Sequence, residues 1–144
     1  METVTDNMKA DHHRCDLIFA QAEKLISEEN WTEGSKEYQL FHEAMEHHFS
    51  MEEDVLFPAF EQRTGMTMGP TQMMRSEHIQ MRGLFDEMEE AVQQQDKDDF
   101  LGLSETLLVI MQQHNAKEEM MLYPMADQEL ADDTADVLQK MSEI

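Results

Sequence analysis

The sequence predicts an all-α fold, an up-down-up-down four-helix bundle that ends in a short C-terminal helix. Helix-favouring residues dominate, and only 5 Gly and 3 Pro occur in 144 residues. No long run alternates apolar and polar residues as a strand does. Turn-forming residues divide the chain into four long segments with short connections, which must lie antiparallel to one another. We expect a single domain over residues 1–144, with the bundle at about 8–127 and the short helix at about 133–142.

The first predicted helix covers about residues 7–28. Thr32 is the predicted N-cap of the second helix, because a threonine hydroxyl can accept a hydrogen bond from a free N–H of the first turn. The second helix extends to about Gln62. We expect Pro58 to disturb its last turns, since proline lacks the N–H that an α-helix requires.

The clearest loop is residues 63–70, which contain two glycines and a proline. A third helix is predicted at about 71–95, a fourth at about 99–127, and a short last helix that ends at Ser142. The N-caps expected for these three helices all carry an acceptor oxygen: Thr71 for the third, Asp96 or Asp98 for the fourth, and the run Asp132, Asp133 and Thr134 for the last.

Composition excludes several classes of protein. Lys+Arg total 10 against 32 Asp+Glu, a formal charge of −22, so neither a phosphate backbone nor an anionic membrane surface would attract the chain. A hydrophobic content of 40% is too high for a disordered acidic tail. A single cysteine is incompatible with a disulfide framework. With no signal peptide in residues 1–10 and no apolar run of about 20 residues, we expect a soluble cytoplasmic protein.

The sequence repeats itself 66 residues apart. The segments His48–Pro58 and His114–Pro124 both read H-x-x-x-E-E-x-x-L-[FY]-P, and the same offset places Asp11-His12 on Glu77-His78. The chain therefore consists of two related helical hairpins, each with one histidine on its first helix and a His-x-x-x-Glu on its second.

Helix residues four apart lie on the same face, so the histidine and glutamate of each repeated block can reach one point in the bundle interior. Two carboxylates there are costly unless cations neutralise them, and imidazole with carboxylate suits iron, manganese or zinc. The alternative is solvated histidines on charged faces. The duplicated spacing favours a two-metal site with room for a bridging oxygen and a small molecule. Its predicted ligands are His12, His48, Glu52, His78, His114 and Glu118, with Glu52 and Glu118 bridging.

The other candidate residues have weaker patterns. His13, His42 and His47 have no histidine at the repeat offset, and we expect them at the surface. Tyr123 could be redox-active, but its counterpart is Phe57, so packing is the favoured explanation. The methionines are interpreted as adaptable core residues rather than soft-metal ligands; those weighed for the second role are Met66, Met68, Met73 and Met74.

These motifs resemble the hemerythrin-like (HHE cation-binding) family over about residues 8–127. The resemblance implies a non-haem di-iron centre, oxo- or hydroxo-bridged, in which the four histidines are terminal ligands and the two glutamates bridge. Zinc and manganese would accept the same ligands. Ferritin-like bundles use Glu-x-x-His pairs, and no histidine of this chain has a glutamate three residues before it.

Oxygen-carrying hemerythrins have a further histidine one turn after the third-helix ligand, where this chain has Arg82. The loss of that imidazole leaves an extra open position, and we expect Arg82 to line the pocket. Cys15, one turn from His12, either lines the pocket or, as the favoured interpretation, is a small buried apolar residue. The four-His, two-Glu set looks more like iron–sulfur-cluster repair proteins that respond to nitric oxide and oxidative stress.

Two main functions follow from the resemblance. The favoured one is a binding protein that takes O2 or NO for sensing, storage or delivery. The alternative is an enzyme that reduces NO or peroxide or oxidises iron with an external electron donor, or an iron donor under oxidative or nitrosative stress. Metal storage by an acidic bundle is a third. Stable gas adducts favour binding, and multiple turnover with a reductant favours catalysis. The sequence leaves the oligomeric state open.

Overall fold

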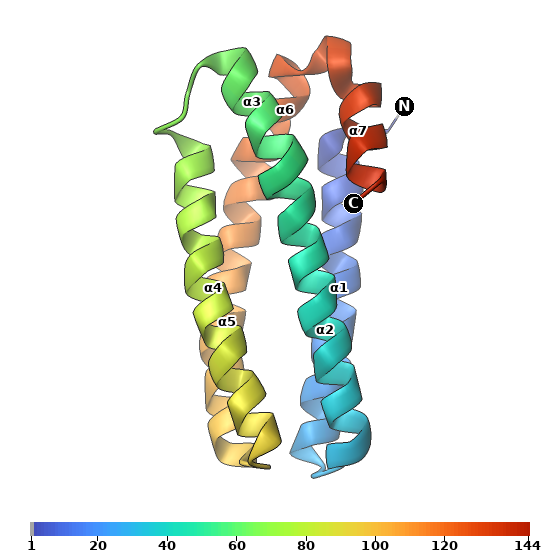
Figure 1. Ribbon diagram of the computed structural model, residues 1–144, viewed down its shortest axis with the longest axis vertical. Helices are drawn as coiled ribbons and strands as arrows, with labels where there is room; N and C mark the ends of the chain where they lie inside the picture. Colours follow the sequence, from blue (N-terminus) through green and yellow to red (C-terminus); the bar gives the residue numbers. More distant parts are fainter. Residues whose placement is uncertain (1) are drawn as a thin grey trace.

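The computed structural model describes residues 2–144, and over them the chain forms helices and short connections without a strand. Figure 1 shows the four long helices side by side along the long axis, with α1 beside α2 and α4 beside α5. The all-α bundle with a short C-terminal helix is thereby confirmed. The elements are α1 (Val4–Ser27), α2 (Trp31–Met51), η1 (Glu52–Leu56), α3 (Phe57–Thr64), α4 (Pro70–Gln93), α5 (Lys97–Lys117), η2 (Glu118–Leu122), α6 (Tyr123–Glu129), η3 (Ala131–Asp133) and α7 (Thr134–Ser142).

The first helix begins earlier than predicted. Thr3 is its N-cap and accepts a hydrogen bond from the Asp6 N–H at 3.0 Å. The Asp127 carboxylate of α6 accepts from the Val4 N–H at 2.7 Å and from the Thr5 N–H at 3.2 Å. Because these free N–H groups are satisfied by a residue more than 120 positions away, the start of α1 depends on tertiary contacts.

Asn30, and not Thr32, caps α2. The Asn30 side-chain oxygen accepts from the Glu33 N–H at 3.3 Å, so the sequence prediction for this cap was wrong by two residues. Asp96, the first of the two aspartates predicted for α5, accepts from an N–H of the first turn at 3.1 Å. Asn30 and Asp96 are themselves 66 residues apart. The repeat therefore includes the turns before α2 and α5, and the two N-caps occupy equivalent positions in it.

Replacing Asn30 with alanine should lower the free energy of unfolding by about 1 kcal/mol, because a free N–H of α2 loses its partner. Thr32→Ala should change it by less than about 0.5 kcal/mol, since Thr32 is exposed and makes no cap hydrogen bond. Urea unfolding of both variants, with a chelator present throughout, measures the difference. Equal losses in the two variants would contradict this assignment of the cap.

Each long helix that carries a repeated block continues through a π-helical turn. Pro58 does not end the second helix; the chain passes through η1 and α3 as far as Thr64. The Phe57 N–H donates to the Glu52 carbonyl and, in the second block, the Tyr123 N–H donates to the Glu118 carbonyl. A proline ring would clash with the carbonyl four residues earlier in an α-helix, so the wider turn just before each proline accommodates it.

The third helix starts without the predicted cap. α4 begins at Pro70, and Thr71 lies inside its first turn, fully buried. The Thr71 hydroxyl donates instead to the Glu61 carboxylate of α3 at 2.7 Å. Gly65 ends α3 with a φ of 72°, a left-handed conformation that glycine adopts without steric cost. Burial of Thr71 against α3 therefore replaces its capping role.

Two buried apolar clusters fill the bundle. The first lies between the four long helices around Phe19, Phe41 and Phe85. The second lies at the end of the bundle around Phe57 and includes residues of α7, which therefore covers that end. Cys15 belongs to the first cluster, in agreement with its favoured interpretation as a small apolar residue.

The methionine prediction was wrong at three of the four positions named above. Met66, Met68 and Met73 are exposed, and only Met74 is buried, in the second cluster. The three exposed residues lie in or next to the loop between α3 and α4. Among the helices of residues 2–144, none combines the length and the apolar character that a membrane span requires.

Candidate metal centre

A buried polar layer separates the two apolar clusters. All of its residues are 5% exposed or less, and they come from both hairpins. The layer consists of His12 of α1, His48 of α2, Glu52 of η1, His78 of α4, His114 of α5 and Glu118 of η2. The structure thus brings all six predicted ligand residues to one place.

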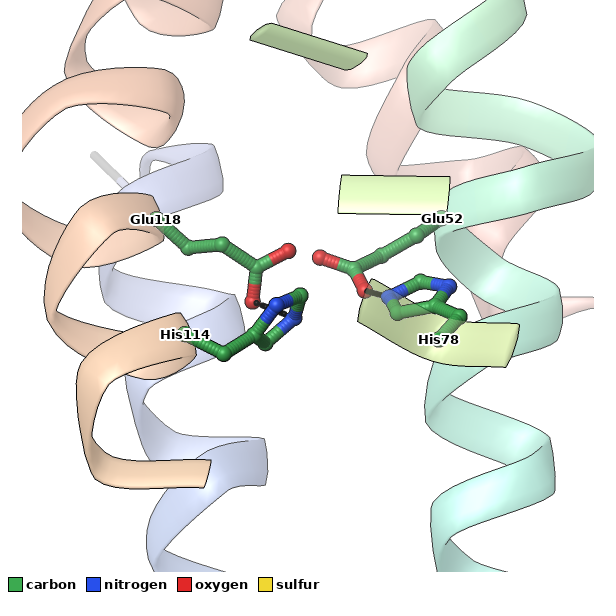
Figure 2. Close-up of side chains that lie close together, drawn as sticks. All are labelled: Glu52, His78, His114 and Glu118. Atoms are coloured by element: carbon green, nitrogen blue, oxygen red, sulfur yellow. Dashed lines mark ion pairs between the residues drawn. The ribbon is translucent and has the colours of Figure 1, made fainter. Parts of the chain in front are cut away.

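These residues form two groups in which the ligand atoms lie within 4.8 Å of one another. Glu118 belongs to both groups. Figure 2 shows the larger one, with the Glu52 and Glu118 carboxylates facing each other from opposite sides of the bundle. The members of the larger group are Glu52, His78, His114 and Glu118, and those of the smaller are His12, His48 and Glu118.

The donor atoms of the larger group lack hydrogen-bond partners within residues 2–144. They are Glu52 Oε1, His78 Nε2, His114 Nε2 and Glu118 Oε2. His78 Nε2 lies 3.0 Å from Glu52 Oε1, but the two groups are not aligned for a hydrogen bond. Unpaired buried polar atoms are costly and rare, and here four converge. A divalent or trivalent cation would satisfy two imidazole nitrogens and two carboxylate oxygens together, so the donor set fits a metal.

The two central carboxylates are strongly coupled. Burial, and then the charge of Glu118, raise the pKa of Glu52 well above its usual range. Burial would also raise the pKa of Glu118, but its contact with Glu52 and the charge of His114 outweigh that effect and lower it. Two neighbouring buried carboxylates do not both ionise without a positive charge nearby, so Glu52 keeps its proton in the metal-free protein. A cation bound between the two carboxylates would take the place of that proton.

Each histidine of the layer donates a hydrogen bond from its Nδ1–H to a carboxylate. The four Nδ1–oxygen distances are all 2.7 Å, and the pairs are His12–Glu119, His48–Asp11, His78–Glu53 and His114–Glu77. This contact places a hydrogen on Nδ1 and turns Nε2 towards the centre, as in metal-ligating histidines. These carboxylates were not predicted from the sequence. The repeat could have found them, because Asp11 pairs with Glu77, and Glu53 with Glu119, at the 66-residue offset.

The histidines differ in protonation. Burial, followed by the charge of His114, lowers the pKa of His78 to about 4. Burial also lowers the pKa of His48. In His12 and His114 burial acts in the same direction, but contacts with Glu118 outweigh it and raise the pKa. His48 and His78 are therefore neutral at pH 7, the form that binds a metal.

Arg82 does not point at the central oxygens. Its guanidinium donates to both oxygens of Glu53, at 2.8 and 3.0 Å, and to Glu46, and lies 5.0 Å from the Phe49 ring centre. Its side chain is one-third exposed. Arg82 thus fixes the carboxylate that orients His78 and acts on the centre through that contact.

Tyr123 does more at the site than the favoured explanation, packing, allowed for. Its ring packs in the second apolar cluster as expected, and its hydroxyl lies among the central donors. Its oxygen lies 2.7 Å from Glu52 Oε2 and 2.9 Å from Glu118 Oε1, so its single hydrogen can be donated to either carboxylate. Burial and these two carboxylates raise its pKa, so the phenol is neutral in the metal-free protein. Sequence comparison with Phe57 concealed this role, because the repeat pairs a phenol with a phenyl ring.

The histidines expected at the surface lie outside the centre. His13 is exposed, His42 is half-buried near Glu46, and the exposed His47 lies 3.2 Å from the Ile144 carbonyl oxygen. Burial raises the pKa of the Cys15 thiol to about 12, which keeps it protonated and unreactive.

Asp11→Asn should lower the free energy of unfolding by about 2 kcal/mol at pH 6 and by about half as much at pH 3. Burial opposes ionisation, but hydrogen bonds from His48 and Arg14 prevail and lower the pKa of Asp11 to about 2. A lowered carboxyl pKa stabilises the fold above the ordinary value of 3.8, and the contribution is lost as the pH falls towards 2. Urea titrations of chelated protein at both pH values test this, with exposed Asp86→Asn as control. A constant difference between the two pH values would contradict it.

A family model described as the hemerythrin HHE cation binding domain matches residues 3–126. This covers most of the chain, so the protein belongs to the hemerythrin HHE cation-binding family. No curated protein and no solved structure gives a significant match. Membership of a cation-binding family is consistent with the observed layer of histidines and glutamates, which could hold metal.

Proposed function

We propose that this protein binds two iron ions in the buried layer and takes up a diatomic gas, O2 or NO, at that centre. One cation would be held by His12 and His48 and the other by His78 and His114. The Glu52 and Glu118 carboxylates would bridge them. The observation that carries the proposal is the set of four convergent donor atoms without hydrogen-bond partners.

The pairing of histidines has support in their positions. The His12 and His48 rings are 4.6 Å apart between centres, and the His78 and His114 rings are 5.1 Å apart. Each pair takes one histidine from each long helix of one hairpin, and both pairs face the Glu52 and Glu118 carboxylates. Iron would supply exchangeable coordination positions and a change of oxidation state.

The surroundings select a small ligand. All six side chains of the layer are nearly or fully buried, so a ligand must pass between packed side chains to reach them. Apolar clusters on both sides exclude water and strengthen the electrostatic contacts inside. The formal charge of −22 would also attract cations to the protein before they bind.

The test is a metal count on protein purified without air, followed by optical spectra after addition of O2 and then of NO. Two irons per chain with reversible gas adducts would support the proposal. Two irons that oxidise irreversibly, with multiple turnover of peroxide or NO when a reductant is supplied, would favour the enzyme. Less than one metal per chain after reconstitution would contradict the di-iron assignment.

A further inference from the structure

The two halves of the centre differ at one position of the repeat. Tyr123 follows η2 and Phe57 follows η1, and the two residues are 66 positions apart. The Phe57 ring stacks near His78, with 5.7 Å between ring centres, and presents only carbon atoms. The Tyr123 ring lies 5.6 Å from the His12 ring and carries a hydroxyl. The two histidine pairs therefore have different neighbours.

The Tyr123 hydroxyl oxygen lies in the middle of one donor set. It is 3.2 Å from His12 Nε2 and 3.4 Å from His48 Nε2. Its distances to Glu52 Oε2 and Glu118 Oε1 are 2.7 and 2.9 Å. Two imidazole nitrogens and two carboxylate oxygens thus surround it. A cation that takes these four atoms must either displace the hydroxyl or accept it as a further oxygen ligand.

Displacement is difficult because the side chain is held in place. Tyr123 is fully buried and belongs to the second apolar cluster, between Leu122 and the turn that Pro124 begins. Rotation of the ring away from the centre would disturb that cluster, because buried side chains are close-packed. A bound cation stabilises the deprotonated form of the groups that coordinate it, so these groups lose their protons.

We propose that Tyr123 is an oxygen ligand of the cation held by His12 and His48. Formation of the metal–oxygen bond breaks the phenol O–H bond, and the proton leaves to solvent. The phenolate fills one coordination position of this cation. Phe57, beside His78, has no oxygen, so the equivalent position of the other cation stays open. The external ligand therefore binds to the cation held by His78 and His114. This second step rests on the proposed function.

The chain offers a matched set of variants. Tyr38 and Tyr123 are its two tyrosines, and the Tyr38 hydroxyl donates to the Phe85 carbonyl oxygen at 2.6 Å, within the first apolar cluster. Tyr123→Phe removes the proposed ligand and keeps the ring. Phe57→Tyr adds a phenol at the equivalent position beside His78. Tyr38→Phe removes the other tyrosine and serves as the control.

Each protein is loaded with Fe(II) without air, oxidised with ferricyanide and examined by visible absorption and resonance Raman spectroscopy. A phenolate bound to Fe(III) gives a charge-transfer band in the visible region and enhanced tyrosinate vibrations. Wild type and Tyr38→Phe are expected to show both signals. Tyr123→Phe should lose them while retaining two irons, and Phe57→Tyr should increase them. Azide titration should show at least a tenfold weaker affinity in Phe57→Tyr.

The outcomes separate the two proposals. Two irons in wild type without tyrosinate vibrations, or unchanged vibrations in Tyr123→Phe, would overturn the tyrosine ligand and leave the di-iron proposal standing. Failure of wild type to bind iron would overturn both. Should Tyr123→Phe not fold, the Raman spectrum of Tyr38→Phe decides, because Tyr123 is then the sole tyrosine. Unchanged azide affinity in Phe57→Tyr would overturn the assignment of the external ligand to the His78 side.

Discussion

Replacing Glu118 with glutamine is expected to remove most of the stability that bound metal gives to this protein. Glu118 belongs to both groups of donor atoms and is fully buried, so one substitution weakens both metal positions. At a free metal concentration of about 100 times Kd, one site adds about 2.7 kcal/mol to the free energy of unfolding. Wild type should lose at least that amount on chelation, and Glu118→Gln less than about 1 kcal/mol.

The measurement is urea unfolding of loaded and chelated samples of both proteins. Glu87→Gln makes the same chemical change on the exposed face of α4 and should behave as wild type. An equal loss on chelation in Glu118→Gln and wild type would show that this carboxylate does not hold the metal. Total metal per chain, counted in the same samples, provides a second readout.

In the absence of metal, replacing the other central carboxylate, Glu52, with glutamine is expected to stabilise the fold. The raised pKa of Glu52 destabilises the fold above the ordinary carboxyl range, because the unfolded chain ionises there and the folded chain does so less readily. Chelated Glu52→Gln should therefore resist urea better than chelated wild type at pH 8 and equally well at pH 4. Bound metal reverses the order at pH 8.

The largest loss of folding stability is expected from Phe85→Ala, about 3–5 kcal/mol. Phe85 is fully buried in the first apolar cluster, and its ring lies edge-on to Phe41 with 5.7 Å between centres. Removal of the ring leaves a cavity between both hairpins. Leu17→Ala, at a residue 60% exposed, should change stability by less than about 0.5 kcal/mol. Urea unfolding with chelator present measures both, and a loss below about 1 kcal/mol for Phe85→Ala would contradict this packing argument.

Local sequence rules succeeded for most interactions within one helix or one turn, although they missed the cap at Asn30. The four-residue spacing of His48 and Glu52 places both on one face wherever the helix packs. Asp96 caps α5 through an N–H three residues later, and the same arrangement at Asn30 was available from the repeat. Thr71 was misassigned because its partner, Glu61, belongs to another helix.

The sequence by itself determined the helical class, the duplication and the six residues that the structure gathers in one layer. Those conclusions depend on spacing within a helix and on a repeated motif, which are properties of the linear chain. Only the tertiary structure decided that Tyr123 enters the centre and which carboxylate each histidine contacts. These contacts join residues up to 111 positions apart. They depend on how each helix is rotated against its neighbours and on the π turns that shift the side chains after them, and neither is encoded in local periodicity.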